Sequence, residues 1–194
     1  MYAVRWTTLG IAAVALAGCG SKTETRHTDT VVAAGNAASA GSTSASGVAV
    51  PASPGQSFAN AAAASDAFEI ASSQIAQQQA GSAAIKKFAD SMIKAHTSST
   101  AKLKSAAAAA SPAITPDPAL TATQQQKLDG LKSLDGRAFD QAYAKAQVEA
   151  HKETLEALKA NAANQKVPQS LRTFASELIP TVTAHLNMAN ALSR

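Results

Sequence analysis

Apolar residues recur at helical spacing through most of this 194-residue chain. From Ser57 onward, Ala, Leu, Lys, Gln and Glu dominate, and hydrophobic positions return every three or four residues, as in amphipathic helices. No segment shows the strict alternation that is typical of a β-strand. The pattern predicts four long helices and one short helix, the short one being the third, over residues 57–80, 82–110, 121–134, 137–165 and 168–194.

Turn and cap residues separate these segments. Gly81 ends the first segment as a C-cap residue, and Ser82 and Thr121 precede the second and third segments as N-caps. Three prolines in the loop 111–120 end the second helix, and Pro168 suits the first turn of the last one. Long amphipathic helices with short or moderate connections pack well as an antiparallel bundle. We therefore expect an all-α fold, an antiparallel four-helix bundle with an additional short helix.

The first twenty residues follow a different pattern. Arg5 precedes an apolar run over residues 9–17, which is roughly half the length that a membrane-crossing helix needs. A cationic start, a short apolar core and a small-residue exit are typical of a secretory signal peptide. The run ends in Leu16-Ala17-Gly18-Cys19, which resembles the bacterial lipobox. The alternative is an ordinary secretory signal in which this cysteine has no role.

The lipobox resemblance implies a membrane anchor. Residues 1–18 would be the lipoprotein signal peptide, cleaved between Gly18 and Cys19, and the Cys19 thiol would carry the lipid. One acyl chain binds a bilayer only marginally, whereas the two or three fatty acids of a lipoprotein, such as palmitate, anchor it stably. Gly20 follows instead of an aspartate, which by resemblance favours the outer membrane, with the protein facing the periplasm. Cys19 is the only cysteine, so no disulfide is expected.

Residues 19–56 comprise the lipidated cysteine and a stretch rich in Ser, Gly, Thr and Ala. Such a stretch buries too little apolar surface to offset the entropy of ordering it. We expect a flexible tether with a span of roughly 35 Å, in which His27 is a solvated histidine. The bundle then occupies residues 57–194.

Charge and motifs exclude several function classes. The chain has 17 Lys and Arg against 13 Asp and Glu, a net charge of +4, and the cations are scattered along the helices. Nucleic-acid binding needs a basic face with groove-reading partners, so no nucleic-acid partner is expected. No Gly-x-Ser-x-Gly elbow and no phosphate-binding glycine loop is present. We therefore expect no enzymatic activity.

Four polar residues lie on the predicted apolar faces. His96 falls near the centre of the stripe in its helix, His185 lies inside the stripe of the last helix, and His151 lies on the later part of a drifting stripe. Glu69 stands beside the apolar face of the first helix. Buried polar groups need partners, which here are one another, water or a metal ion. These four residues are therefore the candidate metal ligands.

The predicted helices carry too few carboxylates on their apolar faces for a two-metal site. A ferritin-like di-iron centre takes a Glu from each of two helices and Glu-x-x-His from each of the other two. Ile93, Val148 and Val182 stand three residues before the histidines instead. Glu69 is the main face-borne carboxylate, with Asp140 as a second candidate. Two interpretations stay open: a buried hydrogen-bond network without a cofactor, or a site for a single transition-metal ion.

Three stretches carry a family resemblance: FADSMIKAHTSSTAKL, FDQAYAKAQVEAHKETLEAL and ELIPTVTAHLNMA. They resemble the DUF4142 family of bacterial exported proteins, over roughly residues 57–192. The resemblance implies a ferritin-like helical fold, and it implies no established activity. Family members often carry Asp-His where this chain has Ala95-His96, which removes a possible carboxylate partner of the histidine.

The sequence thus predicts a lipid-anchored periplasmic bundle that acts without catalysis and binds an unknown envelope protein or a small ligand. The alternative is a metal-binding or redox protein that uses Glu69, His96, His151 and His185. Co-location of these side chains in the folded core distinguishes the two functions. Nitrogens of His96 and His185 farther than about 5 Å from each other and from Glu69 would exclude a shared metal ion, because bonds from protein ligands to transition metals are near 2 Å.

Overall fold

A computed structural model describes residues 51–194 of the chain. This part forms five helices, α1 (Pro54–Gln79), α2 (Ala83–Ala108), α3 (Ala122–Lys132), α4 (Gly136–Ala163) and α5 (Gln169–Leu192). Within residues 51–194 there is no strand, and one isolated bridge joins Ala80 and Gly136. The prediction of an all-α fold with four long helices and one short helix is confirmed.

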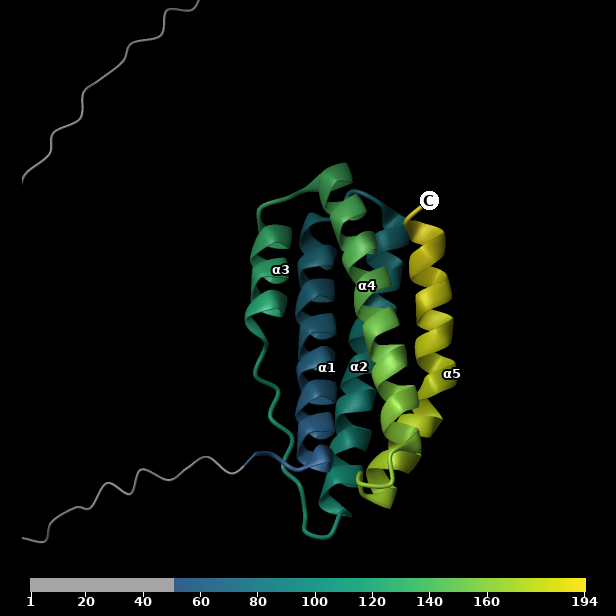
Figure 1. The fold of residues 1–194 in the computed structure, drawn as a ribbon. Helices are drawn as coiled ribbons and strands as arrows, with labels where there is room; N and C mark the ends of the chain where they lie inside the picture. Colours follow the sequence, from purple (N-terminus) through teal and green to yellow (C-terminus); the bar gives the residue numbers. More distant parts are fainter. Residues whose placement is uncertain (1–50) are drawn as a thin grey trace, which may run out of the picture. The chain divides into compact units, whose positions relative to one another are not determined.

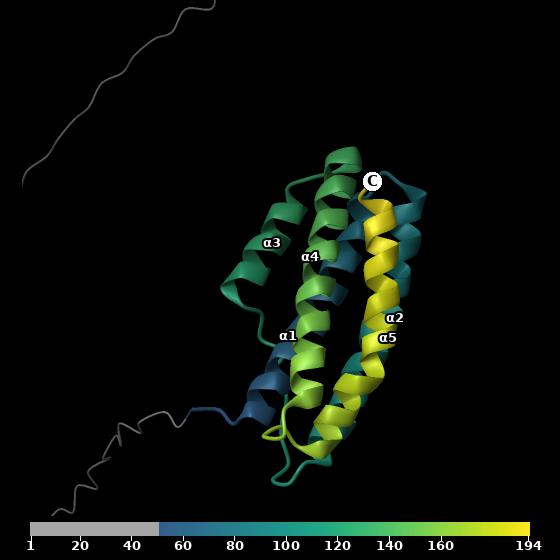
Figure 2. The same cartoon turned by 45° about the vertical axis from the view of Figure 1, so that its right-hand side comes forward.

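The four long helices pack as a bundle with α3 on its outside (Figure 1). Helices α1 and α5 run in one direction and α2 and α4 in the other, so each long helix is antiparallel to the two that it packs against (Figures 1 and 2). The segment between α2 and α4, which contains α3, brings the chain back along the bundle. One such crossover connection is the arrangement of ferritin-like bundles.

Helix α1 begins earlier than the sequence pattern predicted. Ser53 is its N-cap, and the Ser53 hydroxyl accepts a hydrogen bond from the backbone N–H of Gln56 at 3.2 Å. Pro54 occupies the first turn, where its missing N–H is not needed. Residues 54–56 therefore belong to the bundle and not to the tether. The proposed signal peptide and Cys19 lie outside the described residues.

The other helix ends agree with the cap residues in part. Ser82 caps α2, and Thr121 caps α3 in a reciprocal capping box with Gln124, both as predicted. Gly81 is not the C-cap of α1, since Ala80 holds that position in an extended conformation. Gly81 instead lies close to Gly136, and its N–H donates a hydrogen bond to Asp140 Oδ1 at 3.1 Å.

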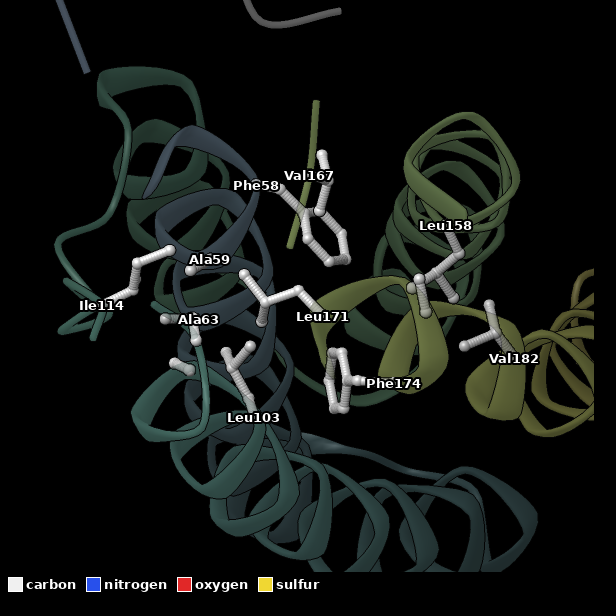
Figure 3. Packing of buried hydrophobic residues seen from close by; sticks show 13 residues of the cluster. Phe58, Ala59, Ala63, Leu103, Ile114, Leu158, Val167, Leu171, Phe174 and Val182 are labelled. Atoms are coloured by element: carbon white, nitrogen blue, oxygen red, sulfur yellow. The ribbon is translucent and has the colours of Figure 1, made fainter. Parts of the chain in front are cut away.

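Buried apolar side chains form two clusters along the bundle. The first apolar cluster lies where α1 begins and contains Phe58, Leu103, Leu158, Leu171 and Phe174 among others (Figure 3). The second apolar cluster lies where α1 ends and contains Phe88, Met92, Phe139, Tyr143 and Ala189 among others. Polar side chains occupy the core between them. Among the described residues, no helix is long and apolar enough to cross a membrane.

Candidate metal centre

The middle of the core is a buried polar layer between the two apolar clusters. The layer consists of Asp66, Glu69, Ser72, Ser73, His96, Ser99, Gln147, His151 and His185. All of these side chains project from the four long helices toward the bundle interior. In helix bundles, metal sites are built in this region from side chains on facing helices.

Helical periodicity explains why the three histidines face inward. His96 lies four residues after the buried Met92 and seven before the buried Leu103, so it shares their face of α2. His151 on α4 and His185 on α5 have buried neighbours at the same kind of spacing. Because the apolar residues turn one face of each helix toward the core, the histidine on that face also points into the core.

The histidines come from three different helices and meet. One ring nitrogen from each of His96, His151 and His185 lies within 4.8 Å of the other two. Their ring centroids are 5.5–5.9 Å apart. His96 and His185 therefore lie within the predicted limit of about 5 Å from each other, whereas Glu69 is not part of this close group.

One ring nitrogen of His96 is held by a carboxylate. His96 Nδ1 lies 2.8 Å from Asp66 Oδ1, and the Thr100 hydroxyl donates a hydrogen bond to Asp66 Oδ2 at 3.1 Å. Because a carboxylate accepts hydrogen bonds, Nδ1 carries the hydrogen of this pair. The other nitrogen, Nε2, is buried and has no hydrogen-bond partner.

His151 is oriented in a similar way. Its Nδ1 donates a hydrogen bond to the backbone carbonyl of Gln147, one turn earlier in α4, at 2.8 Å. Its Nε2 is buried without a partner, as is Nδ1 of His185. A metal-ligating histidine typically donates its second ring N–H to a carboxylate or a backbone carbonyl. His96 and His151 both show this arrangement, with the opposite nitrogen free to coordinate an ion.

Glu69 lies beside the histidines but outside their close cluster. Its Oε1 is 3.9 Å from Nδ1 of His151, and neither of its carboxylate oxygens has a hydrogen-bond partner. The residue is 1 % exposed. An ionised carboxylate is costly to bury without compensation, and a cation held by the histidines would supply that compensation. Of the four predicted ligands, the structure brings three together and places the fourth next to them.

The protonation states of two histidines suit metal binding. Burial lowers the pKa of His151 and of His185 to about 4. Both imidazoles are therefore neutral near pH 7, which is the form that coordinates metals. Burial also acts to lower the pKa of His96, but its hydrogen bond to Asp66 and the charges of Glu69 and Asp66 outweigh burial and raise it. When His96 is charged, Nε2 also carries a proton. A metal ion at Nε2 would take the place of this proton, while Nδ1 would keep its hydrogen bond to Asp66.

Burial also shifts the pKa of the Glu69 carboxyl group. Burial raises the pKa of Glu69 from its usual value of 4.5 to about 7, and nearby Asp66 acts in the same direction. His96, the amide of Gln147 and Lys127 act in the opposite direction without cancelling the effect of burial. An additional positive charge in the polar layer would lower the pKa of Glu69 and favour its ionised form.

Asp66 is the functional candidate that sequence reasoning missed. Ala95, not a carboxylate, stands directly before His96, and the structure supplies a carboxylate from another helix. Asp66 lies three residues before Glu69, which puts both on one face of α1. That spacing is the signal that would have found it. Asp140, the second candidate carboxylate, is not in the polar layer and binds the N–H of Gly81 instead.

The three imidazoles fit one ion of moderate softness. Zinc–imidazole bonds are near 2.0–2.1 Å, so nitrogens that share a tetrahedral ion are about 3.3 Å apart. The three nitrogens lie within 4.8 Å of one another, so binding such an ion requires the imidazoles to move closer together. Imidazole ligands suit zinc, copper, iron and nickel. The layer lacks the several carboxylates of a di-iron centre, so a single ion is the arrangement that it fits.

A comparison with known protein families finds one that matches this chain. A family model described as "Domain of unknown function (DUF4142)" matches residues 30–192. No curated protein and no solved structure matches the chain. The description of this family states no activity.

Proposed function

This chain belongs to the DUF4142 family, and we propose that it binds a single transition-metal ion through His96, His151 and His185. One observation carries the proposal. Ring nitrogens from three helices converge in the core, and at each histidine a buried nitrogen has no hydrogen-bond partner. An ion bound by those nitrogens would satisfy all three at once.

A hydrogen-bond network alone explains the polar layer less well. In a complete network, buried donors and acceptors are paired with one another, because an unpaired buried group costs about 1–3 kcal/mol. Here the outer atoms are paired, as in the bonds of His96 to Asp66 and of His151 to the Gln147 carbonyl. One buried nitrogen of each imidazole has no protein partner, and a shared metal ion would pair with all three.

Glu69 supports the same interpretation through its charge. A divalent ion held by three neutral imidazoles keeps its full charge, and a buried carboxylate beside it lowers the cost of that charge in the core. Glu69 is the carboxylate that lies next to the histidine cluster without a hydrogen bond of its own. We assign Glu69 the role of charge partner and the three histidines the role of ligands.

We further propose that this metal-binding bundle is a lipoprotein of the bacterial cell envelope. The support is the resemblance of Leu16-Ala17-Gly18-Cys19 to a lipobox and the polar stretch that follows it. A lipid on Cys19 would moor the bundle at the periplasmic face of the outer membrane. A non-enzymatic role, with an envelope partner or a small ligand, stays the expectation from sequence.

Metal analysis of the full-length protein tests the proposal. The protein is purified in detergent without chelators, and its zinc, copper, iron and nickel contents are measured, followed by zinc titration of the metal-free form. We expect up to one equivalent of metal, and at least a hundredfold weaker zinc binding in His96→Ala, His151→Ala and His185→Ala. His27→Ala is the matched control, because His27 is the remaining histidine of the chain. Less than a tenth of an equivalent, together with no zinc binding by the metal-free form, would refute metal binding.

A further inference from the structure

A small cavity adjoins the histidines inside the bundle. Its volume is about 40 Å³, and His96 and His185 form part of its wall. Asp66, Ser99, Thr154 and Thr181 contribute polar groups to the rest of the wall, one from each long helix. The cavity is thus part of the bundle core and not a groove on its surface.

His96 and His185 line the cavity, whereas His151 and Glu69 do not. Glu69 does not line the cavity, and its place in α1 is one turn beyond Asp66, toward Ser72 and the second apolar cluster. The cavity wall includes Leu158 and Phe174, which belong to the first apolar cluster. The cavity thus extends from His96 and His185 toward the first apolar cluster, and Glu69 lies outside it.

The size of the cavity limits what it can hold. A cavity needs a volume of about 10–15 Å³ to hold one water molecule. This cavity therefore accommodates two or three waters or one molecule of about three heavy atoms. Its wall combines apolar side chains with hydroxyl groups, including the Ser65–Thr154 pair, whose oxygens are 3.0 Å apart. Larger organic ligands are excluded.

Two residues of the cavity wall, on α2 and α5, also reach the protein surface. Thr181 on α5 lines it and is exposed, and Ala95 on α2 lines it and is half-buried. Ser99, deeper on α2, is buried. The cavity wall therefore runs from the surface at Thr181 to the buried residues Ser99, His96 and His185.

We propose that the metal ion keeps an exchangeable coordination position that faces this cavity and takes one small donor molecule, such as water or a triatomic anion. The inference rests on the proposed function, because it needs the ion to be bound. Zinc sites with three protein ligands characteristically leave the fourth position to such a molecule, whereas structural sites are closed by four protein ligands. Three converging histidines with a cavity beside them correspond to the open type.

Cobalt(II) substitution and azide titration test this inference on the full-length protein in detergent. Cobalt(II) reports its coordination by visible absorption, and azide is small enough for the cavity. We expect a saturable change of the cobalt spectrum with azide. Ser99→Leu and Thr181→Leu would fill the cavity and weaken azide binding at least tenfold, with cobalt affinity changed less than twofold. Thr183→Leu, at an exposed α5 position that does not line the cavity, is the matched control.

The outcomes separate the two proposals. If no cobalt spectrum develops, the proposed metal site itself fails, and this inference fails with it. If cobalt binds but azide leaves its spectrum unchanged, the metal site stands and the exchangeable position is refuted. If azide binds equally well to Ser99→Leu, Thr181→Leu and the wild type, the ion has an open position that does not face this cavity. Thr181→Leu changes an exposed residue, so the test does not depend on the folding of Ser99→Leu.

Discussion

Nδ1 of His96 on α2 lies 2.8 Å from Oδ1 of Asp66 on α1, and both side chains are buried. The carboxylate fixes the imidazole ring and its tautomer, so that Nε2 is the nitrogen left for coordination. The pair joins two helices across 30 residues of sequence and connects the polar layer to the packing of α1 against α2.

Asp66→Asn tests the positioning role of this carboxylate. We expect zinc affinity to fall 10- to 100-fold, because loss of a carboxylate that orients a ligating histidine commonly has that effect. A competition titration against a chromophoric chelator measures the change. Asp90→Asn, an exposed position on α2 whose carboxylate pairs with Lys94, is the control and should bind zinc like the wild type. Equal affinity in the two variants would contradict the role assigned to Asp66.

Bound metal should stabilise the fold. At a free zinc concentration one hundred times the dissociation constant, binding to the native state alone adds about 2.7 kcal/mol to the free energy of unfolding. For a domain of this size that corresponds to a rise in Tm of roughly 5–10 °C. Thermal unfolding followed by circular dichroism, with zinc and then with excess EDTA, measures the shift. His151→Ala should lose the rise and His27→Ala should keep it. An identical Tm with and without zinc in the wild type would count against a site in the core.

The pKa of Glu69 gives a pH dependence for the metal-free protein. Burial raises this pKa from 4.5 to about 7, so the folded state holds a proton that the unfolded state has already released in that interval. The stabilising contribution of the protonated carboxyl is complete below pH 4.5 and is lost as the pH rises to about 7. A shift of this size corresponds to about 3 kcal/mol.

Glu69→Gln removes this titration. Between pH 4.5 and 7, we expect the free energy of unfolding of the wild type to fall by about 3 kcal/mol relative to that of the variant. Urea unfolding in the presence of EDTA measures this difference. The comparison reports the coupled titration of Glu69 and His96, because the charge of Glu69 also raises the pKa of His96. Below pH 4.5 the difference between the two should be constant. Parallel stability curves over the whole range would show that Glu69 is not buried as described.

Gly55 tests the start of α1. A Cβ at this position would lie 2.6 Å from Cδ of Pro168 and 2.9 Å from Cδ1 of Ile114, so Gly55→Ala requires the helix start to move. We expect a loss of about 1–3 kcal/mol, as for other overpacked sites. Gly130→Ala in α3 is the control, because a Cβ there has no neighbour within 4 Å. It should stabilise by about 0.5–1 kcal/mol through helix propensity. The same sign of effect in both variants would contradict the packing of α1 against the start of α5.

Cys19→Ser tests the proposed anchor. We expect the variant to lose incorporation of radiolabelled palmitate and to accumulate as the unprocessed precursor, because serine has no thiol for the thioether bond. Gel mobility and label incorporation measure the two effects. The matched control is Ser21→Ala, two residues further on, which should be labelled and cleaved normally. Normal labelling of Cys19→Ser would refute the lipobox assignment.

The helices were predictable because their signals are local. The 3.6-residue spacing of apolar positions and the caps at Ser82 and Thr121 act within a few residues of the chain, and they appear in the structure where the pattern indicated. The start of α1 was misplaced because residues 54–56 were assigned by composition to the Ser- and Ala-rich stretch before them. The Ser53 cap and the close approach of Gly55 to Pro168 and Ile114 show that these residues belong to the packed bundle.

By itself the sequence determined the all-α class, the approximate helix limits and the inward orientation of the three histidines and Glu69. The tertiary structure decided which of these side chains meet, that Asp66 orients His96 and that a cavity lies beside the imidazoles. The physical reason is that helical periodicity sets the direction of a side chain around its own helix axis. Distances between side chains on different helices depend on how far each helix slides and rotates against its neighbours, and those are set by packing of the whole core.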